Sequence, residues 1–132
     1  QELIKVDVDG ESVIIYPAEK DGKPIGAAVE TFTKNGFSGL IKIMVGFDVE
    51  GNVINYSVLE HKETPGLGSK MGEWFTSGKG DIKGKNPAKD NFTVSKDGGD
   101  IDAITAATIS SRAFLDAINR AHKVYMTNKI SN

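Results

Sequence analysis

Residues 102–111 carry the side chains best suited to chemistry in this chain of 132 residues. The segment reads Asp-Ala-Ile-Thr-Ala-Ala-Thr-Ile-Ser-Ser and places hydroxyl groups at 105, 108, 110 and 111, where a long helical pattern begins. A helix N-terminus presents free backbone N–H groups and the positive end of the helix dipole, so it binds phosphate readily. The small Ala106 and Ala107 would let a bulky group approach the backbone. These residues indicate an anion site, although Ser and Thr at a helix start more often serve only as caps.

The elements that must position this segment begin with strands. β-Branched runs and alternation predict strands at residues 12–16, 25–33, 40–47 and 53–59, the last two joined as a β-hairpin by the turn at residues 50–52. Residues 61–68 have no period and contain one Pro and two Gly, which predicts a loop. Ser69 is the predicted N-cap of a short helix to about Thr76, with Met71, Trp74 and Phe75 on its apolar side. Residues 92–95 are predicted as a last strand and residues 96–100 as a turn.

A long C-terminal helix is predicted from about Thr108. Asp116 and Arg120 are expected on its exposed side. The negative C-terminal end of the helix dipole is expected to be stabilised by basic side chains, those of Arg120, His122, Lys123 and Lys129. Strands followed by one long helix predict an α+β fold, a single domain over residues 1–132 with helices packed on an antiparallel sheet. The apolar positions of the helix are Ile109, Ala113, Phe114, Ala117, Ile118, Ala121, Val124 and Tyr125.

The composition excludes several classes of protein. A net charge of −2 gives no electrostatic reason to expect nucleic-acid binding. The absence of cysteine excludes disulfides, thiolate metal sites and iron–sulfur clusters. No apolar run approaches the roughly 18 residues of a membrane helix. Because the chain opens with Gln1, we expect that an upstream segment was removed or left out, and that any membrane anchor lay there.

Common catalytic motifs are incomplete in this sequence. A phosphate loop would need Gly at 79 and Ser or Thr at 86, where Lys79 and Asn86 stand, and a dinucleotide fingerprint would need Gly in place of Met71. A nucleophile elbow at residues 36–40 fails at Leu40. Two distant histidines make a poor metal site. We therefore predict no catalytic residue and no metal site.

Three segments together resemble a known family. Residues 102–108 (DAITAAT) resemble the D-x-x-(S/T)-(G/A)-A-T signature at which a flavin transferase joins FMN to the final threonine. Residues 61–68 (HKETPGLG) resemble the H-x-E-T-P-G-L-G loop of the same family. Residues 36–39 (GFSG), followed by residues 45–48 (VGFD) and Gly51, are similar to its aromatic-and-glycine strand pair. This family is that of the G subunit of the Rnf electron-transport complex (RnfG), and it includes the C subunit of the sodium-pumping NADH:quinone reductase. The chain departs at Ala106 and Ser38, where the family more often has Gly.

The resemblance implies a specific flavin site. Thr108 would carry FMN through its phosphate as a phosphoester, made by a separate Mg-dependent transferase that uses FAD. Asp102 would help the transferase recognise the threonine, with a turn hydrogen bond as the alternative. Glu63 could bind the flavin or be a solvated loop carboxylate, Leu67 could cover the ring or be a core contact, and His61 could contact the flavin or make a loop hydrogen bond. The implied cofactor-binding residues are His61, Glu63, Thr64, Leu67, Gly68, Asp102, Thr105, Ala107, Ser110 and Ser111.

The resemblance also implies an electron-relay subunit of a membrane-bound, ion-translocating oxidoreductase rather than a stand-alone enzyme. Its partners would be other membrane subunits and the transferase. It would lie on the extracytoplasmic, periplasmic face of the membrane, tethered by an N-terminal helix that this chain lacks. The alternatives are a flavinylated domain of a larger extracytoplasmic reductase or membrane-bound regulator, and a flavin-free interaction module. We also predict that residues 61–68 pack beside the start of the last helix, and that the protein folds without flavin.

Overall fold

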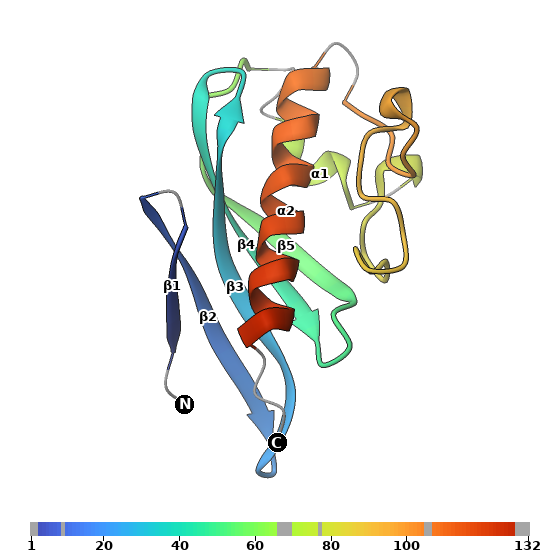
Figure 1. Ribbon diagram of the computed structural model, residues 1–132. Coiled ribbons are helices and arrows are strands. Elements are labelled where there is room, and N and C mark those ends of the chain that lie inside the picture. Colours follow the sequence, from blue (N-terminus) through green and yellow to red (C-terminus); the bar gives the residue numbers. More distant parts are fainter. Residues whose placement is uncertain (1–2, 9, 66–69, 77, 105–106, 129–132) are drawn as a thin grey trace.

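The computed structural model describes residues 3–8, 10–65, 70–76, 78–104 and 107–128. Its framework is one antiparallel sheet in which the strands follow chain order: β1 (Ile4–Val8), β2 (Glu11–Lys20), β3 (Lys23–Gly36), β4 (Gly39–Asp48) and β5 (Val53–Glu60). The long helix α2 (Thr108–Asn128) crosses one face of this sheet (Figure 1). The α+β prediction of an antiparallel sheet with a long C-terminal helix is thereby confirmed.

The core lies between the sheet and α2. In β4 every second side chain points to the helix and is buried, because successive side chains of a strand point to opposite faces: Ile41, Ile43, Val45 and Phe47. Phe114, Leu115 and Ile118 fill the space from the helix side. Two threonines of β3 also face the helix and must be satisfied there: the hydroxyl of Thr31 donates to the carbonyl of Ala117 at 3.0 Å, and that of Thr33 to the Asp116 carboxylate at 2.8 Å.

The predicted hairpin of β4 and β5 is confirmed, and its turn shapes the far end of α2. Gly51 has a φ of +89°, and a Cβ atom there would lie 2.7 Å from Nε2 of His122. His122 is buried against the hairpin, edge-on to Phe47, and does not serve the helix terminus as predicted. Burial lowers its pKa. His122 is not at the helix terminus because α2 continues beyond it as far as Asn128.

Three further predictions about α2 are corrected by its docking on β3. Asp116 and Arg120 are half-buried, not on an exposed side: Arg120 donates to the Phe32 carbonyl at 2.7 Å and to Asp116 at 3.1 Å. The guanidinium also lies over the Phe32 ring. Ile109 is 49% exposed, although its spacing placed it on the apolar face. The buried face of α2 is therefore rotated toward residues that sequence reasoning assigned to solvent.

Two elements differ from prediction near the ends of the sheet. Strand β1 was not predicted, although Ile4, Val6 and Val8 alternate with polar residues as a strand requires. The strand predicted at residues 92–95 is wrong: Val94 makes one isolated bridge to Ile101, and Ser95–Asp97 form a 3₁₀ turn. That stretch contains apolar residues because Phe92 and Val94 belong to the core, and sequence periodicity cannot distinguish a short buried irregular segment from a short strand.

The short helix α1 (Met71–Trp74) begins after Lys70, which occupies its N-cap position and makes no side-chain cap hydrogen bond. Ser69, the predicted N-cap, lies outside the described residues. As predicted, Met71 and Phe75 are fully buried. Nowhere in the described ranges is a helix both long and apolar enough to cross a membrane.

Candidate functional site

Thr108 is the first residue of α2, as the sequence predicted, and its side chain is half-buried. The segment before it is tightly held where it is described, since Ile101 and Ile104 are buried and the Ala107 N–H donates to the Ile104 carbonyl at 3.0 Å. Thr105 lies outside the described residues. The first turn of α2 contains no acidic residue. Thr108 thus stands at the positive end of a helix dipole, with no carboxylate of that turn competing for the position of an anion.

The two serines of this turn face inward. Ser111 is fully buried: its Oγ accepts the Ile104 N–H at 2.8 Å and donates to the Ala107 carbonyl at 2.9 Å. Ser110 is also buried, and its hydroxyl donates to Glu63. Both hydroxyls, proposed from sequence as phosphate contacts, have partners inside the protein. The first turn therefore has an inner side that holds the fold and an outer side formed by Thr108 and the exposed Ile109.

Glu63 connects the inner side of this turn to the tip of the β3–β4 hairpin. Glu63 is 4% exposed, and its carboxylate accepts three hydrogen bonds: from the Phe37 and Ser38 backbone N–H groups, both at 2.9 Å, and from the Ser110 hydroxyl. The alternative of a solvated loop carboxylate is therefore wrong. The contact confirms, for the described part of the loop, that residues 61–68 pack beside the start of α2. The donors lie 25, 26 and 47 residues away, so no local pattern could have identified them.

The other loop residues are placed as follows. Nδ1 of His61 accepts the Glu63 N–H at 3.0 Å, which is the loop hydrogen bond that one of its two interpretations expected. Thr64 is exposed. Leu67 and Gly68 lie outside the described residues.

Helix α1 supports the segment that leads into α2. The indole N–H of Trp74, a residue predicted on the apolar side of this helix, donates to the Asp102 carbonyl at 2.9 Å. Phe75 stacks on Phe114 of α2 with ring centroids 4.2 Å apart. Tyr56 of β5 donates its hydroxyl to the Met71 carbonyl, and burial, with smaller contributions from nearby carboxylates, raises the pKa of Tyr56 to about 12. Asp102 itself is half-buried.

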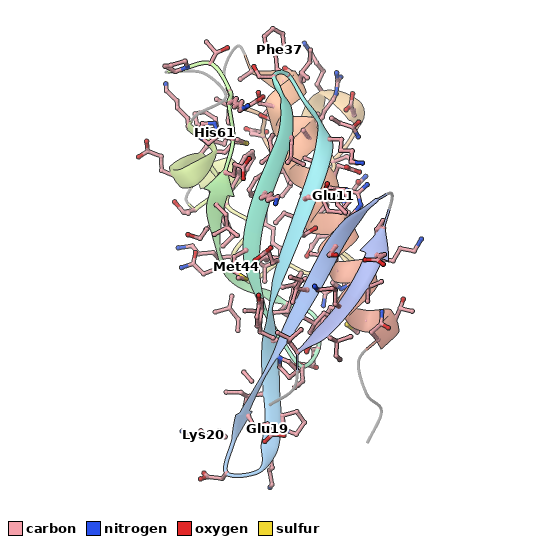
Figure 2. The ribbon with its side chains drawn as sticks, turned by 90° about the vertical axis from the view of Figure 1, so that its left-hand side faces the viewer. Glu11, Glu19, Lys20, Phe37, Met44 and His61 are labelled. Carbon is pink, nitrogen blue, oxygen red and sulfur yellow. The ribbon has the colours of Figure 1, made fainter. Side chains whose placement is uncertain are left out.

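Phe37 lies next to this site through its backbone, although the sequence did not place it among the candidate residues. It lies at the tip of the β3–β4 hairpin, and 65% of it is exposed although its backbone N–H is bound to a buried carboxylate. Figure 2 shows it at the same end of the molecule as His61. The signal in the sequence was an aromatic residue between two glycines, Gly36 and Gly39. Nothing in the alternation of β3 indicated that this ring would be left outside.

The site can therefore bind an anion on the outer side of the first turn of α2, with one reactive hydroxyl at that position. The residues present fit a phosphate-linked group: an accessible threonine, first-turn amides, the small neighbour Ala107 and no acidic residue in the turn. They provide exposed apolar surface close by, at Ile109 and at the hairpin tip. Among the described residues of this site, nothing pairs a general acid with a general base.

Known proteins match this chain over most of its length. A family described as FMN-binding domain matches residues 36–123. The chain is 44% identical over 113 residues to the G subunit of the ion-translocating oxidoreductase complex of Salmonella typhimurium, covering 81% of this chain and 53% of that protein. The same subunit from Escherichia coli K12 is 43% identical with the same coverage, and that of Aliivibrio fischeri is 41% identical over 90% of this chain and 58% of its own length. The chain thus spans about half the length of these relatives.

Proposed function

The chain belongs to the FMN-binding domain family, and on that basis we propose that it is an electron-relay domain carrying FMN on Thr108. The observation that supports this most directly is the placement of Thr108, half-buried at the first position of α2, with no acidic residue in the turn. Its neighbours Ser110 and Ser111 are buried and bonded within the protein, so Thr108 is the reactive hydroxyl of the first turn that reaches the surface.

The proposed attachment is a phosphoester made after translation. The Thr108 hydroxyl oxygen displaces AMP from FAD at the phosphorus of the FMN half and loses its proton, so that Thr108 retains FMN. A separate Mg-dependent transferase catalyses this step, and Asp102 helps it recognise the threonine. Thr105 and Ala107 of the signature contact the bound cofactor. When bound, the flavin supplies the redox chemistry, and the protein sets its position and potential. The amides of the first turn of α2 hold the phosphate, and Thr64, Leu67 and Gly68 contact the flavin from the loop. His61 supports this loop by accepting the Glu63 N–H.

The assignment to a complex rests on the relatives, which are named as subunits of an ion-translocating oxidoreductase complex. We propose that this chain acts in such an assembly, at the extracytoplasmic face of a membrane, and that its partners are other subunits of the complex. The chain passes electrons rather than transforming a substrate, in keeping with the lack of an acid–base pair among the described residues of the site.

The experiment that tests this proposal is co-expression with a flavin transferase, followed by denaturing electrophoresis viewed under ultraviolet light. Wild-type protein should give a fluorescent band that survives denaturation, because the bond is covalent. Thr108→Ala should give no fluorescent band. Thr105→Ala retains the terminal threonine of the signature and should therefore still give a fluorescent band, although a weaker one. Covalent flavin on Thr108→Ala would refute the assignment of this residue, and a colourless wild-type protein would refute covalent attachment altogether.

A further inference from the structure

Arg112 is a charged neighbour of Thr108 on the surface of α2. It follows Thr108 by four positions, and residues four apart in an α-helix lie on the same face, with Cβ atoms about 5–6 Å apart. Helical side chains lean toward the N-terminus, so the side chain of Arg112 covers the turn that begins with Thr108. Almost half of this side chain is exposed, at 48%. Arg112 therefore borders the position at which Thr108 presents its hydroxyl.

The guanidinium of Arg112 is held along one edge by Asp97. Its Nε and Nη2 atoms donate to the two carboxylate oxygens of Asp97, both at 2.8 Å. Two parallel bonds of this kind fix the plane of the guanidinium as well as its position. The hydrogen bonds from Arg112 also lower the pKa of the Asp97 carboxyl, which therefore stays ionised at neutral pH. Within the described ranges, the remaining N–H groups of Arg112 have no hydrogen-bond partner, so they can donate to an added anion.

The loop that carries Asp97 is fixed against α2. Asp97 ends the 3₁₀ turn Ser95–Asp97, and its N–H donates to the carbonyl of the fully buried Val94 at 2.9 Å. Asn119, further along α2, donates to the Phe92 carbonyl of the same loop at 2.9 Å. Figure 1 shows this loop beside the helix. Asp97 thus holds the guanidinium from a fixed position.

The charge of Arg112 is unfavourable for the helix by itself. A cation near a helix N-terminus faces the positive end of the dipole, and the first turn of α2 contains no acidic residue that would offset it. Asp97, on a different segment, is the carboxylate that pairs with Arg112. An anion on Thr108 would lie close to both the first-turn amides and the guanidinium. The start of α2 therefore has two sources of positive potential that favour the same anion.

We infer that Arg112 binds the phosphate of the flavin carried by Thr108, and that Asp97 orients the guanidinium for this contact. The inference rests on the proposed function, which supplies the phosphate. Joined to both the threonine and the ribityl chain, that phosphate is a diester with a single negative charge and non-bridging oxygens that accept hydrogen bonds. A guanidinium edge is suited to such oxygens. The inference adds a binding residue that lies outside both the threonine signature and the loop at residues 61–68.

The test is phosphorus-31 nuclear magnetic resonance of the whole protein, loaded by the transferase. The linked phosphate gives a resonance whose chemical shift depends on the charge and hydrogen bonds at its oxygens. In native wild type it should be displaced from its position in denaturant, and Arg112→Gln should move it toward the denatured position. Arg112→Lys keeps the charge without the guanidinium edge and should lie between the two. Lys123→Gln removes an exposed cation at the other end of α2 and should match wild type.

Urea unfolding gives a second measurement. Without flavin, Arg112→Gln should unfold close to wild type, because an exposed ion pair contributes little to stability. With flavin attached, Arg112→Gln should have an unfolding equilibrium constant about two- to fivefold higher than wild type, as expected for the loss of one exposed charge contact. Added salt should narrow this difference, because it screens the attraction between guanidinium and phosphate.

The outcomes separate this inference from the proposed function. Wild-type protein without covalent flavin overturns both. Loaded Arg112→Gln with the wild-type resonance and the wild-type midpoint overturns the phosphate contact alone and leaves the attachment to Thr108 standing. Arg112→Lys with a resonance identical to wild type overturns the contact through a guanidinium edge held by Asp97. This variant retains the positive charge at position 112, so it decides the matter even where the transferase loads Arg112→Gln poorly.

Discussion

Replacing Ser111 with alanine should destabilise the protein even when no flavin is attached. The Ser111 hydroxyl accepts the buried N–H of Ile104 and donates to the Ala107 carbonyl, so its bonds lie within the protein. Removal leaves the Ile104 N–H without its acceptor, whereas the Ala107 carbonyl still accepts the backbone N–H of residue 111 at 3.0 Å. Ser111 holds the turn that leads to Thr108, which makes it a structural residue of the attachment segment.

The expected magnitude follows from the single unsatisfied donor. A buried N–H that loses its partner costs about 1–3 kcal/mol, and the better helix propensity of alanine offsets roughly 0.5 kcal/mol of that loss. The free energy of unfolding should therefore fall by about 0.5–2.5 kcal/mol. For a urea dependence of about 2 kcal/mol per molar, the midpoint should fall by about 0.3–1.2 M.

The assay is urea unfolding of Ser111→Ala and wild type, both produced without the transferase. Ser57→Ala, at an exposed position of β5, is the control and should stay within about 0.5 kcal/mol of wild type. An unchanged midpoint for flavin-free Ser111→Ala, with a loss of stability only in the loaded protein, would refute the reasoning. That result would show that Ser111 acts on the phosphate, as the sequence pattern alone suggests.

Three other expectations concern the fold. Protein made without transferase should unfold in one cooperative urea transition, because the apolar contacts of α2 do not involve the flavin; absence of a transition would contradict this. Phe114→Ala should lose about 3–5 kcal/mol in the same assay, since it removes a fully buried ring stacked on Phe75; a loss below about 1 kcal/mol would contradict the packing. Burial lowers the pKa of His122 below 6.5, so the unfolded chain binds a proton that the native state excludes, and stability should fall as the pH drops below that value. His122→Phe should weaken this fall between about pH 7.5 and pH 5, and an unchanged pH dependence would refute it.

Elements with local signals could be predicted from the amino-acid sequence. Apolar residues at helical spacing defined α2 from its first residue, and alternation around the turn at Gly51 defined the β4–β5 hairpin. The position of Thr108 at a helix start also followed from sequence, since it depends only on where the helical pattern begins. β1 carried an equally local signal in its alternating Ile4, Val6 and Val8.

Contacts between side chains from distant segments could not be predicted in the same way and follow from the packing of the elements. Glu63 looks from its neighbours like a solvated loop carboxylate, and its burial depends on two amides at the tip of a hairpin 25 residues earlier. From the sequence, Arg120 is predicted to be a surface residue and His122 a helix-end residue. In the structure Arg120 binds the backbone of β3, and His122 packs against the turn at Gly51. The physical reason is common to all three. A polar group is buried where another element supplies its partner or covers it, and that element is chosen by the packing of α2 on the sheet rather than by adjacent residues.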